Sequence, residues 1–284
     1  TLARLAAKCV CEDRSKALAT YFTTSSQNGG AVPLQLGVGV SGGTEIAVHA
    51  ARLLLEANPD WGCCSNDIRN GFNCVSRQAV LDALARGAFS DLLPVVSKFY
   101  CRESLLFAGS DELRHPPPPT PGNAARANAE ALDATAAAVA AATSADATPP
   151  PIRSTSGVRQ GDPYGPLLFA LAYHPALLQV AEEFPDCVVL AYLDDTYVLG
   201  PRERAWAANL RLQELAKALS DLDSNSSKVE YFAADASADL SFLPAEVAGS
   251  PHHPDPAKRR LRGFKCVGAY IGADDWAREK LLAK

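Results

Sequence analysis

Two runs of β-branched, aromatic and aliphatic residues flank the adjacent aspartates Asp194 and Asp195. Residues 188–193 precede the pair and residues 196–200 follow it. Such runs favour strands buried in a sheet, so the sequence predicts a tight β-hairpin with the aspartates at its tip. Adjacent carboxylates held there repel each other unless a cation neutralises them, and Mg²⁺ bound by carboxylates and phosphates is the usual cation. The hairpin therefore predicts a sheet with an acidic, metal-dependent site at one edge.

A third carboxylate follows a separate β-like run. Asp67 comes directly after the short apolar-to-polar segment 61–66. Three acidic side chains from two β-elements are suited to hold two metal ions for phosphoryl transfer. The pattern predicts a protein that makes phosphodiester bonds, or one descended from such a protein.

Composition allows a large core but gives no overall positive charge. The chain has 284 residues, 48% of them hydrophobic, which is compatible with one large domain or two. Its formal net charge of −5 is unusual for a nucleic-acid-binding protein, so basic residues must be judged locally. Those near the candidate site or clustered late in the chain are Arg52, Arg69, Arg77, Arg86, Lys98, Arg102, Arg153, Arg159, 258–260, Arg262 and Lys265. For most of them, solvated surface charge is the ordinary interpretation.

The cysteines and the hydrophobic runs indicate the compartment. None of the eight cysteines forms a C-x-x-C pair and several lie in apolar runs, so we expect free thiols in a reducing compartment. No apolar stretch reaches about 18 residues and no signal-peptide pattern opens the chain. We therefore expect an intracellular protein, nuclear or cytoplasmic, that is neither secreted nor bound to a membrane. Because methionine is absent, we also expect a fragment.

Helix and strand signals alternate along the chain. We expect a helix and a polar loop in 1–30, and strands at 229–232 and 264–271. Further helices are expected from a Thr44 cap to Asn58, from a Ser76 cap, and at 91–101, 166–184 and 202–222. The alternation indicates an α/β or α+β sheet covered on one face. Residues 115–151 are low-complexity, rich in proline and alanine, and predict a surface insertion.

One glycine-rich segment has a competing interpretation. Gly37, Gly39 and Gly42 precede a helix and formally match the dinucleotide-binding pattern. Pro33 interrupts the preceding strand, and no acidic residue closes a second strand about twenty residues later. A loop joining two elements is favoured. A dinucleotide-binding oxidoreductase stays as a remote alternative, and it requires a parallel sheet with this loop at a helix N-terminus.

The ordered motifs together resemble the palm of reverse transcriptases, most closely those of the non-LTR (LINE-type) retrotransposon group. The blocks are 35–39 with 42–45, 67–73, 157–169, 192–195, 225–230 and 268–272, within residues 30–110 and 152–278. This resemblance implies an α+β fold: a right-hand polymerase palm, with an antiparallel sheet backed by helices, partial fingers and no thumb. It implies an RNA-directed DNA polymerase that uses an RNA template, a DNA primer and dNTPs.

The resemblance also implies residue roles. Asp67, Asp194 and Asp195 would hold two Mg²⁺ ions, with Mn²⁺ as a possible substitute, and Lys228 would neutralise the departing pyrophosphate. The nucleotide would contact Ile68, Asn70, Phe72, Gln160 and Gly161, with Phe72 as the steric gate against a ribose 2′-hydroxyl. Gly268, Ala269 and Tyr270 would form the primer grip.

Some positions depart from the family pattern. Gly71 stands where alanine is usual and Tyr164 where leucine is usual. We expect partial fingers in 1–60, palm in 61–114 and 152–278, the insertion in 115–151, and a truncated end in 279–284. Because a basic fingers segment and a thumb are expected to be missing, the alternative function is a catalytically inactive, truncated or decayed remnant.

Overall fold

The computed structural model describes residues 2–27, 30–101, 104–106, 152–159 and 161–283. The insertion at 115–151 and Gln160 lie outside these described residues. At the centre is a four-stranded sheet in the order β6-β7-β3-β8, formed by Val188–Tyr192, Asp195–Pro201, Trp61–Asn66 and Glu230–Ala233. Its strand pairs are antiparallel. The parallel sheet required by the dinucleotide-binding alternative is therefore not what these strands form.

The predicted hairpin is confirmed as β6 and β7. Tyr192 pairs with Asp195, which leaves Leu193 and Asp194 as the two-residue turn. Asp195 is thus already the first residue of β7 rather than part of the tip. The other neighbour of β7 is β3, and the last residue of that strand, Asn66, pairs with Thr196. This register brings the ends of three chain segments to one edge of the sheet.

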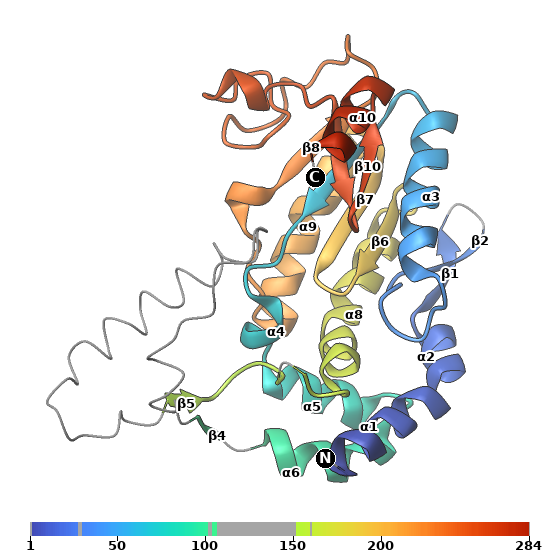
Figure 1. The fold of residues 1–284 in the computed structure, drawn as a ribbon, viewed down its shortest axis with the longest axis vertical. Helices are drawn as coiled ribbons and strands as arrows, with labels where there is room; N and C mark the ends of the chain where they lie inside the picture. Colours follow the sequence, from blue (N-terminus) through green and yellow to red (C-terminus); the bar gives the residue numbers. More distant parts are fainter. Residues whose placement is uncertain (1, 28–29, 102–103, 107–151, 160, 284) are drawn as a thin grey trace, which may run out of the picture.

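Both faces of the sheet are covered, so the expectation of one covered face is wrong. Figure 1 shows β6 and β7 between helix α3 (Gly43–Ala57) on one side and helices α8 (Gly165–Glu183) and α9 (Arg202–Ser220) on the other. Cys64 and Val198 belong to the core under α8 and α9, whereas Cys63 and Leu199 belong to the core under α3. Strands buried on both faces read as continuous apolar runs, which explains the apolar sequence of this hairpin.

Four short helical segments lie beside α8: α4 (Gly71–Cys74), α5 (Arg77–Arg86), the 3₁₀ turn Ser90–Leu92 and α6 (Leu93–Tyr100). Helices α4 and α5 contact α8, and the other two contact α5.

Of the two helix caps that the sequence predicted, one is confirmed and one is wrong. Ser76 caps α5 as predicted, because its side chain accepts a hydrogen bond from Ala79 N–H. The Thr44 cap is wrong: the N-cap of α3 is Gly42, and the Thr44 hydroxyl donates to Glu45.

The N-terminal part contains more structure than the sequence predicted. Helices α1 (Leu2–Asp13) and α2 (Ser15–Tyr21) precede an antiparallel hairpin of β1 (Thr23–Gln27) and β2 (Gly30–Pro33). The expected polar loop is therefore wrong. The sequence Thr-Thr-Ser-Ser-Gln lacks the alternating apolar residues that identify a strand. A second short pair, β4 (Ser104–Leu106) with β5 (Ile152–Ser154), brings residues 106 and 152 together.

The C-terminal part adds a second hairpin against the α3 face. Strands β9 (Gly263–Cys266) and β10 (Ala269–Gly272) pair antiparallel, as predicted, and α10 (Asp274–Leu282) follows. Two 3₁₀ turns, Ser226–Lys228 and Pro256–Lys258, lie before it. Each of the eight cysteines is a free thiol, as predicted. None of the helices in the described ranges combines the length and the apolar composition needed to cross a membrane.

Candidate active site

The three aspartates that the sequence predicts as site residues lie at the same end of the sheet, beside the ends of neighbouring strands. Asp194 lies in the β6–β7 turn, Asp195 begins β7, and Asp67 follows the end of β3. Burial, then the charges of Asp194 and Asp67, raise the pKa of Asp195 to about 6. Burial and, less strongly, Asp67 also raise the pKa of Asp194. The three carboxylates thus form one electrostatically coupled group.

Lys228 reaches this group through a segment that pairs with the chain around Asp67. Asn225 N–H donates to the carbonyl oxygen of Asp67 (2.8 Å) and Arg69 N–H donates to that of Asp223 (2.8 Å). The Lys228 Nζ atom then lies 3.3 Å from Asp67 Oδ2. Lys228 also opposes the rise in the pKa of both Asp194 and Asp195. The predicted lysine and the predicted aspartates therefore meet.

The chemistry of these side chains suits a hard divalent cation, although their present arrangement is not that of a metal cluster. Among the described residues, no group of three or more aspartate, glutamate, histidine or cysteine side chains is arranged to hold an ion. Asp67 is turned to Lys228 instead. Carboxylate oxygens are the ligands that Mg²⁺ prefers, and a bound cation would relieve the repulsion that raises the pKa of Asp195. The donor set fits the implied metal.

Phe72 and the loop around Gly161 form a pocket beside this edge. Val158 N–H donates to the carbonyl oxygen of Phe72 (2.7 Å), which joins the loop directly to α4. The Phe72 ring stacks on Phe169 of α8, with centroids 4.9 Å apart and planes at 8°. The pocket encloses about 470 Å³ and is lined by Phe72, Arg159, Gly161, Asp162, Pro163 and Pro166. The structure thus brings two of the predicted nucleotide residues together.

The other predicted nucleotide residues differ in their surroundings. Asn70 is exposed, has a left-handed backbone (φ 51°), and accepts a hydrogen bond from the Asn73 amide at 2.6 Å. Ile68 is only 3% exposed as a whole residue, so neither its side chain nor its backbone is open to a ligand in this structure. Gln160 lies outside the described residues. The Gly71 departure has a packing reason, because an added Cβ would lie 3.0 Å from the Phe169 ring.

Two residues that the sequence did not single out for this role organise the loop at 157–163. Arg77 of α5 is buried and donates to the carbonyl oxygens of Gly157 (3.0 Å) and Ser154 (2.9 Å). The Tyr100 hydroxyl donates to Asp162 Oδ2 (2.6 Å) and accepts from Arg159 N–H (3.2 Å). The sequence marked Arg77 only as a nearby charge, and no local pattern marks Tyr100.

A basic residue of the first helix also reaches this loop. Gly161 has a left-handed backbone (φ 77°), and a Cβ added there would lie 3.3 Å from Arg4 Nη2. Arg4 belongs to α1 and is exposed. No motif surrounds Arg4 in the sequence, so nothing there marks it as a site residue. The guanidinium adds positive charge beside Gly161.

The predicted primer-grip residues lie at the turn of the β9–β10 hairpin. Gly268 takes a left-handed backbone (φ 92°), and Ala269 and Tyr270 begin β10. The Tyr197 hydroxyl accepts from Val267 N–H (2.9 Å) and donates to the carbonyl oxygen of Lys265 (3.5 Å). Because Tyr197 lies two residues after Asp195, the hairpin is bonded to the strand that carries a site aspartate.

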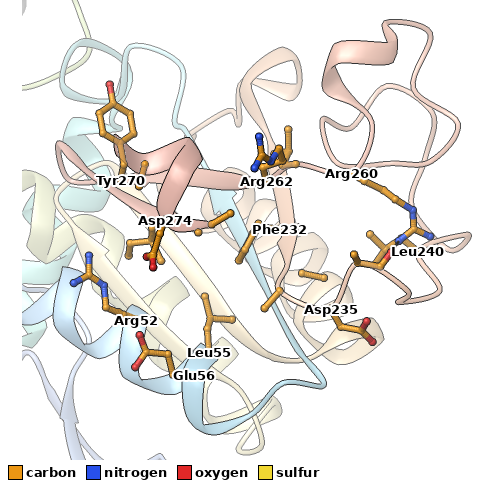
Figure 2. A pocket seen from close by; sticks show the side chains of 18 residues that line it. Arg52, Leu55, Glu56, Phe232, Asp235, Leu240, Arg260, Arg262, Tyr270 and Asp274 are labelled. Atoms are coloured by element: carbon orange, nitrogen blue, oxygen red, sulfur yellow. Dashed lines mark hydrogen bonds between the residues drawn. The ribbon is translucent and has the colours of Figure 1, made fainter. Parts of the chain in front are cut away.

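A larger pocket of about 600 Å³ lies behind this hairpin. Figure 2 shows side chains of α3, β8, the β9–β10 hairpin and α10 around it. The β8 end that lines it, Phe232 and Ala233, pairs with Cys63 and Gly62, toward the start of β3, whereas the site aspartates lie at the other end of the sheet. Its charged side chains are of both signs, namely Arg52, Glu56, Asp235, Arg260, Arg262 and Asp274. This pocket is therefore separate from the aspartate site and selects no charge class of ligand.

Comparison with known families identifies the chain. A family model described as reverse transcriptase (RNA-dependent DNA polymerase) matches residues 44–258. The chain belongs to the reverse transcriptase family. The matched range contains the reverse transcriptase domain's three site aspartates and Lys228, and it ends before the β9–β10 hairpin.

Two relatives show how much of longer proteins this reverse transcriptase domain resembles. The retrotransposable element SLACS 132 kDa protein of Trypanosoma brucei gambiense is 46% identical over 50 residues, which are 18% of this chain and 4% of that protein. An apo telomerase from Candida tropicalis, truncated from its C-terminal domain, superimposes with a TM-score of 0.51 at 10% identity. That match covers 95% of this chain and 44% of the telomerase chain. The second likeness shows the fold alone, and it confirms the α+β polymerase palm.

Proposed function

We propose that this domain is an RNA-directed DNA polymerase that adds dNTPs to a DNA primer on an RNA template. The observation that carries the proposal is the meeting of Asp67, Asp194, Asp195 and Lys228 at one sheet edge, within the range that matches the family model. The identity with a stretch of the SLACS protein supports an origin in a retrotransposon, and the motif order supports the non-LTR group. Free thiols support an intracellular, nuclear or cytoplasmic, location.

In this proposal the three carboxylates are the metal ligands. Asp67, Asp194 and Asp195 would hold two Mg²⁺ ions, or Mn²⁺ as a substitute, which supply activation of the primer 3′-hydroxyl and neutralisation of phosphate charge when bound. The Lys228 Nζ atom lies 3.3 Å from Asp67 Oδ2, so in this proposal it is close to the negative charge that develops on the pyrophosphate. Its ammonium group donates a hydrogen bond, and then a proton, to the departing pyrophosphate.

The pocket beside the carboxylates orients the nucleotide. Phe72 stacks on Phe169, and in this proposal its ring, held in that position, would be the steric gate against a ribose 2′-hydroxyl. The backbone at Gly161 allows close approach of the nucleotide, and Arg159 lines the same pocket. Gln160, Asn70 and Ile68 complete the proposed nucleotide contacts, and Ile68 would have to become more exposed than it is here to make one.

The β9–β10 hairpin is the proposed primer grip. Gly268, Ala269 and Tyr270 stand at its turn, and Tyr197 bonds the hairpin to the strand of Asp195. A primer strand held there would keep its 3′ end at a fixed distance from the carboxylates. Fixed placement of this kind is a large part of catalysis in phosphoryl transfer.

Primer extension on poly(rA) with an oligo(dT) primer tests the proposal. We expect the parent protein to incorporate dTMP with Mg²⁺ or Mn²⁺, and Asp194→Asn to reduce incorporation to background because it removes a ligand charge. The matched control is Asp186→Asn, which alters an exposed aspartate paired with Arg204 and should retain parental activity. A folded parent protein that incorporates nothing would contradict the proposal and support the alternative of an inactive remnant.

A further inference from the structure

The turn that carries Asp194 is gripped by a buried amide from a distant part of the chain. Gln35 is fully buried, and its Oε1 atom accepts a hydrogen bond from Leu193 N–H at 2.7 Å. Its Nε2 atom donates to the carbonyl oxygen of Leu193 at 3.3 Å. One side chain thus satisfies both backbone groups of the residue that precedes Asp194.

Leu193 needs such support because its backbone is in an unfavourable conformation. Its φ angle is 58°, in the left-handed region that L-residues other than asparagine, aspartate and glycine seldom adopt. Two-residue hairpin turns usually place Asn or Gly at such positions. A leucine there persists only where surrounding contacts fix it. The Gln35 amide supplies those contacts.

The segment around Gln35 is itself fixed against β6. Leu36 N–H donates to the carbonyl oxygen of Ala191 (2.7 Å), and Ala191 N–H donates to that of Leu34 (2.8 Å). Gln35 Oε1 also accepts from Gly37 N–H at 3.1 Å. A Cβ on Gly37 would lie 2.7 Å from Leu193 Cγ, so this position has room only for glycine. The close approach gives one glycine of the dinucleotide-like pattern a structural reason.

We propose that Gln35 is a positioning residue for nucleotidyl transfer: through the backbone of Leu193 it fixes the turn from which Asp194 and Asp195 project. This inference rests on the proposed polymerase function. It assigns Gln35 no contact with substrate. In this proposal the Leu34–Gly37 segment supports the turn that carries Asp194.

A neutral amide suits this place better than a charged side chain. Its NH2 group donates to the Leu193 carbonyl oxygen while its oxygen accepts from the N–H of the same residue, so one side chain bonds both groups without adding charge. A lysine or arginine there would pair with the neighbouring carboxylates and compete with a metal ion for them. An aspartate or glutamate would add to the repulsion that already acts on Asp195.

The test compares Gln35→Met with a matched buried amide. Met keeps the length of the side chain but loses the amide's three hydrogen bonds, two with Leu193 and one from Gly37 N–H. The control is Asn209→Leu in α9, whose amide is fully buried and makes no hydrogen bond to any described residue. Two quantities are measured: hydrogen exchange of the Leu193 amide by NMR, and steady-state incorporation of one dNMP on an RNA template.

We expect Gln35→Met to speed exchange of the Leu193 amide by about tenfold or more, since a buried hydrogen bond is lost. We expect kcat to fall by about 10- to 100-fold, because misplacement of about 1 Å has such effects, with KM for the dNTP unchanged. Asn209→Leu should match the parent in both quantities. If Gln35 had only a structural role, Gln35→Met would lower the amount of folded enzyme, and the faster hydrogen exchange would not be confined to the Leu193 turn.

A second variant covers the case in which Gln35→Met does not fold. Gly37→Ala keeps the amide and presses a methyl group on Leu193, so it should also lower kcat and alter Leu193 exchange. If the parent polymerises and Asp194→Asn does not, a parental kcat and parental Leu193 exchange in each variant that folds would overturn the positioning role of Gln35 and leave the proposed function standing. If the folded parent does not polymerise, the proposed function fails, and unchanged Leu193 exchange would independently overturn the Gln35 contact.

Discussion

The turn at Leu193–Asp194 and the loop at 157–159 and 161–163 are supported in the same way, but by side chains that differ in charge. Each is an irregular segment at the site, and each is held by a buried polar side chain from far away in the sequence. The turn is held by Gln35, 158 residues from Leu193, and the loop by Arg77, 80 residues from Gly157. Gln35 is neutral and Arg77 is a cation.

The difference follows from what each segment faces. The turn carries Asp194 and is followed by Asp195, whose pKa is raised by burial and then by the charges of Asp194 and Asp67, and its support by Gln35 adds no further charge. The loop lines the pocket proposed for a nucleotide triphosphate, where positive charge is favourable. Arg77 and Arg159 both lie 5.8 Å from the Tyr100 ring centroid, which lets two cations share one region. Each supporting side chain matches the groups that it holds, an N–H and a carbonyl oxygen at Leu193 and carbonyl oxygens at Gly157 and Ser154.

We expect the largest loss of stability when Arg77, which supports the loop, is replaced. Arg77→Met removes buried charge-assisted hydrogen bonds to Gly157 and Ser154, so we expect unfolding to become easier by about 3 kcal/mol. Urea unfolding followed by circular dichroism measures this. The control is Arg86→Met on the same helix, where the exposed ion pair with Asp82 should contribute less than about 0.5 kcal/mol. Equal stability of the two variants would contradict the assigned role of Arg77.

Removing the Tyr100 hydroxyl should weaken the same loop more gently. Tyr100→Phe loses the hydrogen bonds to Asp162 and to Arg159 N–H, so we expect a loss of about 1–2 kcal/mol. A double-mutant cycle with Asp162→Asn measures the shared interaction. The two substitutions should be non-additive because they remove one contact. Strict additivity of the two free energies of unfolding would show that the hydroxyl does not hold Asp162.

Removing the charge of Asp195, directly after the turn, should change stability the least, and the size of the change should depend on pH. Because the folded-state pKa of Asp195 is raised to about 6 from an ordinary value near 4, its ionised form destabilises the fold above pH 6. Asp195→Asn should therefore raise the melting temperature by about 2–4 °C at pH 7. The gain should shrink as pH falls from 6 to 4, where the folded carboxyl takes up its proton.

Asp186→Asn should change the melting temperature in the opposite direction when it is measured over the same pH range. A hydrogen bond from Arg204 lowers the pKa of Asp186, so its contribution to stability is present above the unfolded-state pKa and is lost as pH falls through the folded-state value. Its replacement should therefore lower the melting temperature at pH 7, and by less at acid pH. Identical pH profiles for the two variants would contradict excess negative charge at the turn.

Features carried by local patterns were predictable from the sequence. The β6–β7 hairpin, the Ser76 cap and the β9–β10 hairpin each depend on residues close together in the chain, and all three are confirmed. The family resemblance of the ordered blocks is confirmed as well. The site roles and the domain boundaries stay predictions, since the fold and the family match do not test them.

Contacts between distant segments were not predictable from the same patterns. Gln35 stood in a recognised block without a role, because its partner Leu193 is brought to it only by the folded sheet. Tyr100 looked like one more apolar helix residue, although its hydroxyl contacts Asp162 62 residues later. The second covered face did have a signal, because continuous apolar runs are typical of strands buried on both faces, but the runs do not say which helices cover them.

The division of labour between the two segments is tested most directly by one kinetic measurement. Single-dNMP incorporation on an RNA template is measured over a range of dNTP concentrations for the parent, Gln35→Met and Arg77→Met. We expect a lower kcat with unchanged KM for Gln35→Met. We expect a raised KM for Arg77→Met, because the loop that lines the nucleotide pocket loses its support. A parental kcat for Gln35→Met, or a change in KM alone for both variants, would show that the two segments do not have these separate roles.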